Sequence, residues 1–172
     1  LAAQCIYAFI WDEYCDWYLE LSKPVLGNPQ AGDAALRGTR HTLVRVLESI
    51  LRLAHPVIPF ISEEIWQRVA PLAGVQGDTI MHQPYPAADA SLSDPAAQAE
   101  MEWVKQFVLG VRKIRSGYNI DPRKPLPVLL QNGSDQDRER VAANRHYVAS
   151  LGRVETIEWL GDAEGPESAT AL

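Results

Sequence analysis

The amino-acid sequence predicts a mainly α fold, in which a bundle of four helices is followed by a small α+β subdomain. Three observations support this prediction. Apolar residues recur every three or four positions over most of the first 117 residues, as on the buried face of an amphipathic helix. Clusters of proline and glycine separate these periodic stretches. After residue 125 the pattern changes to two short apolar runs on either side of one further helical stretch, which is typical of a β-α-β element.

The first two helices are expected over residues 1–22 and 33–54. Pro24 should end the first, because the residue before a proline is pushed out of the helical region. A loop rich in glycine, proline and asparagine follows. Asp33 is a suitable N-cap for the second helix, which should end near Ala54.

Two further helices should complete the bundle. Ser62 can cap a short third helix that stops at Pro71. Asp94 as N-cap and Pro95 in the first turn should open a fourth helix, which Gly117 can terminate. The sequence therefore predicts a helical bundle over residues 1–125.

The subdomain over residues 126–172 is expected to begin with a strand at 126–131. A helix should follow at 135–151, because apolar residues again recur at helical spacing. Residues 154–160 alternate between apolar and polar, as in a half-buried strand. The tail after Gly161 is expected to be frayed.

Composition limits the kind of protein. The chain has 172 residues, of which 47% are hydrophobic and 22% charged, which suits an ordinary globular domain. No apolar run reaches the roughly 18 residues of a membrane span. Because the chain opens in mid-helix by pattern and without a basic leader, we expect a piece of a longer protein without a secretory signal. Two cysteines ten residues apart on one helix lie roughly 15 Å from each other, too far for a disulfide, so we expect a cytoplasmic protein.

The charge is unevenly distributed. The formal net charge of −6 argues against a non-specific nucleic-acid binder, which is usually basic. Residues 103–125, however, hold six basic side chains against one aspartate. This stretch is the most basic part of an acidic chain.

Two arginines interrupt the apolar pattern of their helices. Arg40 and Arg115 both fall within the apolar arc, and a buried guanidinium without a partner is costly. Either each finds a carboxylate inside the bundle, or each stands where the apolar arc extends past the packed core. The pattern alone leaves both alternatives open. The polar arc of the second helix is expected to face outward and consists of Arg37, His41, Arg45, Glu48 and Arg52.

Aromatic side chains gather on the first helix. Packing explains Tyr14 and Trp17, which lie on its apolar stripe. The alternative is that one ring of the group stays exposed and stacks on a nucleobase.

Sequence signatures of catalysis are missing from this chain. It contains no glycine-rich phosphate loop, no G-x-S-x-G turn and no cysteine–histidine spacing of a zinc site. We therefore predict no catalytic, cofactor-binding or metal-binding residue here, and no enzymatic activity of this chain by itself.

A family resemblance lies in seven segments: Trp11 to Val25, Leu36 to Leu43, Leu51 to Pro56, Pro59 to Ile61, Glu64 to Arg68, Gln83 to Pro86 and residues 111–131. These segments resemble the anticodon-binding domain of bacterial valyl-tRNA synthetases, which are class I enzymes. Their combination and order, rather than any single segment, is specific for the valyl type.

The resemblance implies a function in translation. It implies that the bundle docks the anticodon stem-loop of tRNA(Val), and that the longer enzyme joins valine to this tRNA with ATP and Mg²⁺. The H-I-G-H and K-M-S-K-S signatures that bind ATP in the family are not in this sequence. The expected partners are therefore tRNA(Val) and the catalytic domain of the same chain, and we expect a monomer that does not bind membranes.

Loop bases are read by stacking and edge hydrogen bonds, and phosphates are held by Arg and Lys. The candidate tRNA-binding residues are Arg37, Arg40, His41, Arg45, Arg112, Lys113, Arg115 and Asn119. Arg115 is the candidate for the anticodon loop and Arg112 for the stem phosphates. The alternative function is a helical protein-interaction bundle without a role in RNA binding, which the acidic net charge would suit.

Overall fold

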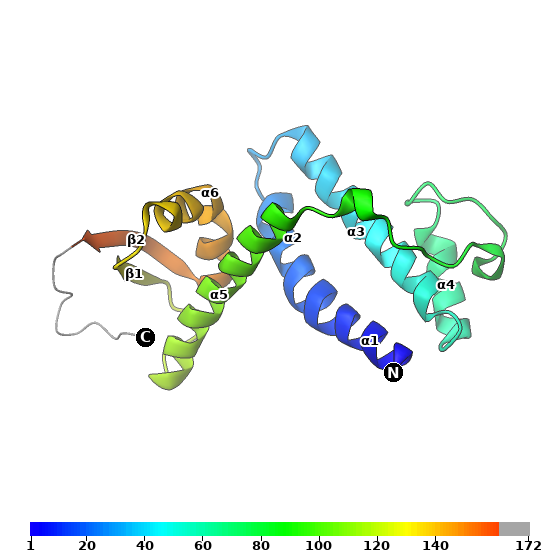
Figure 1. Ribbon diagram of the computed structural model, residues 1–172, viewed down its shortest axis with the longest axis horizontal. Coiled ribbons are helices and arrows are strands. Elements are labelled where there is room, and N and C mark those ends of the chain that lie inside the picture. The colour runs from blue at the N-terminus through cyan, green and yellow to red at the C-terminus, as the bar shows by residue number, and fades with distance from the viewer. Residues whose placement is uncertain (162–172) are drawn as a thin grey trace. The chain divides into compact units, whose positions relative to one another are not determined.

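A computed structural model describes residues 1–161 (Figure 1). The fold is mainly helical with a small parallel sheet near the C-terminus, which confirms the predicted fold class. The chain divides into two compact units, Leu1–Leu92 and a second that begins at Ser93. Among the described residues, no helix is long and apolar enough to span a bilayer. The predicted frayed tail lies outside the described residues.

The first unit opens with one continuous helical stretch. It consists of α1 (Ala2–Ala8), a π-helical segment η1 (Phe9–Leu19) and α2 (Glu20–Leu26). The prediction that Pro24 ends this helix is wrong. Pro24 lies inside α2, where it removes one backbone hydrogen bond without ending the helix, and the chain leaves the helix only at Gly27, whose N–H donates to the Lys23 carbonyl (2.8 Å).

Tyr14 is the buried ring of this stretch. Its exposed fraction is 8%, and its hydroxyl donates to the carbonyl of Leu43 on α3 (3.0 Å). Burial raises the pKa of the Tyr14 phenol above its ordinary value. Trp17, which the apolar stripe predicted to be buried, is only half-buried. The packing prediction therefore holds for Tyr14 and is too strong for Trp17.

Helix α3 (Asp33–Ala54) has the predicted bounds, although Gly32 rather than Asp33 is its N-cap. Helix α4 (Pro59–Val69) packs against α3 (Figure 1). The predicted start of α4 at Ser62 is wrong by one turn. Pro59 occupies the first turn, where its fixed φ favours helix initiation and its missing N–H costs nothing. Ser62 is instead buried inside the helix, and its hydroxyl donates to the Ile58 carbonyl (2.8 Å).

A small apolar core joins α3, α4 and the segment after α4. Its buried members are Leu51, Trp66, Ala70 and Ile80. Ile80 belongs to η2 (Ile80–His82), the first of two 3₁₀ turns in this segment; the second is η3 (Ala90–Leu92). The carboxylate of Glu63 on α4 holds η2 in place, because it accepts hydrogen bonds from the Thr79 hydroxyl (2.8 Å) and the Ile80 N–H (3.1 Å).

The polar arc of α3 is not wholly outward-facing, contrary to prediction. Glu48 is fully buried, with an exposed fraction of 0%. Its carboxylate accepts hydrogen bonds from Trp66 Nε1 (2.9 Å) and Arg52 Nη2 (2.8 Å). Arg52 Nη1 also donates to the Pro84 carbonyl (2.8 Å), which ties the following loop to α3. The arrival of α4 over the second half of the arc is what buries Glu48.

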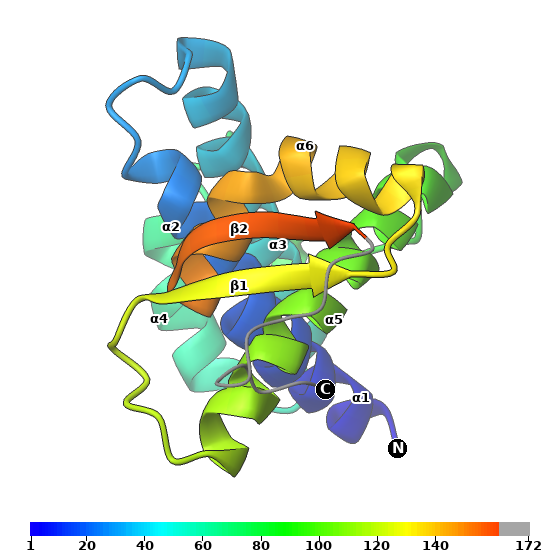
Figure 2. The ribbon, with the colours of Figure 1, turned by 90° about the vertical axis from the view of Figure 1, so that its left-hand side faces the viewer.

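The second unit begins with α5 (Pro95–Gly117), which Asp94 caps as predicted through its side chain and the Ala97 N–H (3.0 Å). Strands β1 (Leu126–Gln131) and β2 (Val154–Gly161) pair in parallel, and α6 (Asp135–Gly152) connects them (Figure 2). Ser134 and Asp137 form a capping box at the start of α6. The Ser134 hydroxyl and N–H hold the pKa of the Asp137 carboxyl below its ordinary value of 3.8.

Helix α5, the predicted fourth helix of the bundle, belongs to the second unit. It packs against α6, and Asn144 on α6 donates to the Glu100 carboxylate (2.6 Å). Trp103 Nε1 likewise donates to Asp137 (3.0 Å). The division between units thus falls at 92/93, whereas the sequence predicted a boundary at 125/126. The apolar face of α5 is buried within the second unit. Periodicity alone shows that this face is buried, but not which element covers it.

Candidate nucleic-acid interface

Three predicted site residues lie along one side of α3. Arg37, His41 and Arg45 are four residues apart, so their side chains project from the same side on successive turns. All three are exposed. They precede the part of the helix where Glu48 becomes buried. The first half of the polar arc is therefore a row of exposed basic side chains, and only its second half is covered.

Arg40 is also exposed, although it falls within the apolar arc of α3. Of the two alternatives left open by the sequence, the second applies to it. The apolar arc extends past the packed core at this point, and the guanidinium remains in solvent. Arg40 therefore accompanies Arg37 and His41 on the exposed N-terminal half of α3.

Arg115 follows the other alternative. Its exposed fraction is 5%, so it is not presented to an external ligand, and the prediction that it contacts the anticodon loop is corrected. Four backbone carbonyls accept its hydrogen bonds, rather than a carboxylate inside the bundle. Nη1 donates to Asp121 (3.1 Å) and Lys124 (2.8 Å), and Nη2 donates to Gly152 (3.1 Å) and Arg153 (2.9 Å).

The remaining predicted residues surround the end of α5. Arg112 and Lys113 are exposed. Asn119 is exposed too, but its backbone has a structural role: φ is +52°, and the Ile120 N–H donates to the Arg115 carbonyl (2.9 Å). This is the left-handed residue of a Schellman motif, a position that asparagine accepts more readily than most residues. The helix ends at Gly117, as predicted, but the left-handed residue that terminates it is Asn119.

A comparison with known protein families shows the family of this chain. Residues 1–130 match the family described as the anticodon-binding domain of tRNA ligase. The chain belongs to this family. The match includes the whole first unit, α5 and most of β1. The exposed cations of α3 and of the α5 end thus all lie inside the matched region of an anticodon-binding domain, whose partner is tRNA.

Exposed aromatic rings occur on the first helical stretch of this anticodon-binding domain. Tyr7 and Trp11 have exposed fractions of 66% and 55%. Their rings are parallel, with centroids 6.4 Å apart. The rings of Tyr7 and Trp11 are therefore accessible for stacking on a base, whereas the buried ring of Tyr14 is not.

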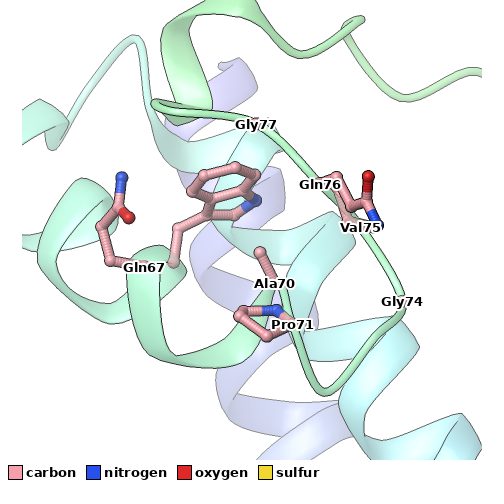
Figure 3. A pocket seen from close by; sticks show the side chains of 8 residues that line it. Gln67, Ala70, Pro71, Gly74, Val75, Gln76 and Gly77 are labelled. Atoms are coloured by element: carbon pink, nitrogen blue, oxygen red, sulfur yellow. The ribbon is translucent and has the colours of Figure 1, made fainter.

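A pocket of about 370 Å³ lies beside the C-terminal end of α4, where residues 71–77 curve around it (Figure 3). Its lining is uncharged and consists of Trp66, Gln67, Ala70, Pro71, Gly74, Val75, Gln76 and Gly77. Two of its polar groups are already bonded: Trp66 Nε1 to Glu48, and Gln67 Nε2 to the Glu63 carboxylate and the Asp78 carbonyl. This lining offers no cation to a phosphate, so we do not place the tRNA contacts of the anticodon-binding domain here.

Two residues that sequence reasoning missed support the α3 surface from inside. They are Glu48 and Trp66, whose hydrogen bond fixes α4 against α3 (2.9 Å). A possible signal was that Glu48 and Arg52 are spaced i,i+4, but this spacing is equally common on solvated helix faces. Within residues 1–161, no group of three or more His, Cys, Asp or Glu side chains is placed to hold a metal ion.

Proposed function

We propose that this anticodon-binding domain is part of a valine-tRNA ligase and recognises the anticodon stem-loop of tRNA(Val). Membership of the family supports tRNA as the ligand, and the resemblance of the segments from Trp11 to Val25 and Leu36 to Leu43 to the valyl type supports valine. The observation that carries the proposal is the row of exposed Arg37, His41 and Arg45 along α3.

The row suits RNA for a physical reason. Arginine binds phosphate oxygens through two parallel N–H groups and can also stack on a base or bond its edge. Arg40 is also exposed on the same half of α3 and adds a third arginine to this surface. At the end of α5, Arg112 and Lys113 are the proposed phosphate contacts. The rest of an acidic chain repels RNA, so these local surfaces orient it.

The wider proposals concern the enzyme to which this domain belongs. The proposed enzyme is a cytoplasmic monomer that binds ATP and Mg²⁺ in a catalytic domain of the same chain, and no cofactor is proposed for the domain described here. Exposed apolar side chains around the start of α4 are suited to contact with such a domain. They are Val57, Ile58, Phe60, Ile61 and Ile65, with Phe60 90% exposed.

The test is a binding titration of this chain with a valine anticodon stem-loop and with a stem-loop that carries another anticodon. The double variant Arg37→Gln/Arg45→Gln is compared with Arg68→Gln, an exposed arginine of α4, as the matched control. We expect the double variant to lower the slope of log affinity against log salt by about two, one for each lost phosphate contact. Arg68→Gln should bind as the parent does.

Three results would contradict the proposal. No binding of either RNA would favour the protein-interaction bundle instead. Equal binding of both stem-loops would remove the valine specificity. An unchanged slope in a correctly folded double variant would exclude the α3 row as a phosphate-binding surface.

A further inference from the structure

The buried guanidinium of Arg115 connects three segments of the second unit. Arg115 itself belongs to the last turns of α5. Its Nη1 holds the carbonyls of Asp121 and Lys124 in the loop after α5, and its Nη2 holds those of Gly152 and Arg153 at the corner between α6 and β2. A direct bond from the Leu126 N–H to the Arg153 carbonyl (3.1 Å) closes the same junction. The loop and the corner are thereby fixed next to each other.

The three connected segments carry exposed cations. These are Arg112, Lys113, Arg123, Lys124 and Arg153. The carboxylates that accompany them in sequence are Asp121, which accepts the Arg123 N–H (2.8 Å), and Glu155, also exposed. Positive charge therefore prevails on these segments, and the buried Arg115 charge beneath them adds to the local positive potential.

Arg153 occupies a backbone conformation that usually selects glycine. Its φ and ψ are +52° and +45°, in the left-handed region, at the C-cap of α6. Glycine would avoid the backbone cost that an arginine bears at such a position. Here the carbonyl of Arg153 is held by Arg115 from inside, while the side chain is exposed. The conformation ends α6, as that of Asn119 ends α5, and the Arg115 hydrogen bonds fix the backbone from which the Arg153 side chain projects.

We propose that Lys124 and Arg153, with Arg123 beside them, form a binding surface for the phosphodiester backbone of tRNA, and that Arg115 is the positioning residue that assembles it. The proposal rests on the proposed function as a tRNA-binding domain and adds a contact surface in the second unit. Arg115 matches this task because its planar fork holds two pairs of carbonyls at once, which a lysine cannot do. Lys and Arg on the outside bind phosphate and release its counterions.

The experiment measures the affinity of this chain for a valine anticodon stem-loop over a series of KCl concentrations. Arg153→Gly and Lys124→Gln are compared with Arg145→Gln, an exposed arginine of α6, as control. We expect Arg153→Gly and Lys124→Gln each to weaken binding several-fold at low salt and to lower the salt slope by about one, with Arg145→Gln unchanged. Because glycine relieves the left-handed strain, a loss in Arg153→Gly is not explained by unfolding.

The variant Arg115→Lys tests the positioning role. It keeps the positive charge and loses the fork, so we expect faster amide hydrogen exchange over residues 121–126 and 152–154 and a salt slope lowered by more than one. Faster exchange with an unchanged slope would overturn the positioning role. Parent-like binding by both Arg153→Gly and Lys124→Gln, while Arg37→Gln/Arg45→Gln binds weakly, would overturn this surface and leave the proposed function intact. No binding by the parent chain would overturn both.

Discussion

Glu48 and Glu64 show how burial changes the contribution of a glutamate–arginine pair to the stability of the fold. Each forms an i,i+4 pair with an arginine, Arg52 at 2.8 Å and Arg68 at 2.9 Å. The side chain of Glu48 has an exposed fraction of 0% and that of Glu64 66%. Solvent screens the second pair and the side-chain entropy offsets most of its attraction, whereas removing one partner of the first leaves a charge with little access to water.

Glu48→Ala is therefore expected to destabilise the chain by about 3–5 kcal/mol, in the range for a broken buried pair. Glu64→Ala, the matched control, should cost no more than about 0.5 kcal/mol. Urea unfolding followed by tryptophan fluorescence measures both. Equal losses of stability in the two variants would show that the hydrogen bonds of Glu48 with Trp66 and Arg52 stabilise the fold no more than the exposed pair of Glu64 does.

Glu63 makes stability depend on pH. Hydrogen bonds, above all from the Gln67 amide and then from Thr79 and Ile80, hold the pKa of its carboxyl below the ordinary 4.5. A carboxyl with a lowered pKa in the folded state stabilises fully above its unfolded pKa and loses this contribution as the pH falls through the folded value. We expect Glu63→Gln to lose less stability than the parent between pH 5 and pH 3, as measured by urea unfolding at each pH. Parallel pH curves would contradict this expectation.

At the scale of elements, the ends of the helices depend on a few local conformations. Asn119 ends α5 in the left-handed region, and Asp94 starts it with a side-chain bond. Left-handed backbone costs an L-residue without local hydrogen-bonding ability about 1–2 kcal/mol. The helix end therefore selects glycine or asparagine at residue 119 for reasons that have nothing to do with RNA.

Asn119→Gly should leave stability unchanged or slightly higher, and Asn119→Ala should lower it by about 1 kcal/mol, as measured by thermal unfolding. The same variants separate the two roles of the residue. If Asn119→Gly keeps its stability and still loses affinity for the stem-loop, the side chain contacts RNA. If affinity is unchanged, Asn119 acts only through the helix end.

At the scale of the whole molecule, the chain consists of two compact units with separate cores. Leu51 and Trp66 belong to the first, and Val104, Val108 and Val148 are buried in the second. The exposed cations that we propose to bind tRNA lie on α3 in the first unit and around the end of α5 in the second.

The two units should respond separately to a defect in one of them. We expect Glu48→Ala to accelerate amide hydrogen exchange in α3 and α4 and to leave α6 and β2 unchanged, because partial unfolding follows cooperative units. Mass-spectrometric exchange on the full chain measures this. Accelerated exchange in β2 as well would mean that the two units open as one.

The whole chain should also lack activation chemistry. Because neither ATP-binding signature is in the sequence, we expect no valine-dependent pyrophosphate exchange, measured with the purified chain at saturating ATP and valine. Exchange above the background of a blank preparation would contradict the proposal that the catalytic domain lies elsewhere in the enzyme.

Local features of the molecule were predictable from the sequence because they depend on neighbouring residues. The bounds of α3, the Asp94 cap of α5 and the two strands around α6 match their predictions. Periodicity, capping side chains and turn residues act within one or two turns of chain. The errors at Pro24 and Ser62 are errors of one turn, where two local signals compete and the better placed one prevails.

The sequence by itself determined the fold class, the exposure of Arg37, His41 and Arg45 on α3, and the family resemblance, because these depend on the order and type of residues along the chain. Only the tertiary structure decided that Glu48 is buried under Trp66, that Arg115 binds carbonyls 37 and 38 residues away in sequence, and that α5 packs with α6. A periodic pattern shows which face of a helix is buried, but it does not show which other element that face packs against. Arg40 and Arg115 interrupt the same kind of apolar arc, and the one that meets four carbonyls is buried while the other remains in water.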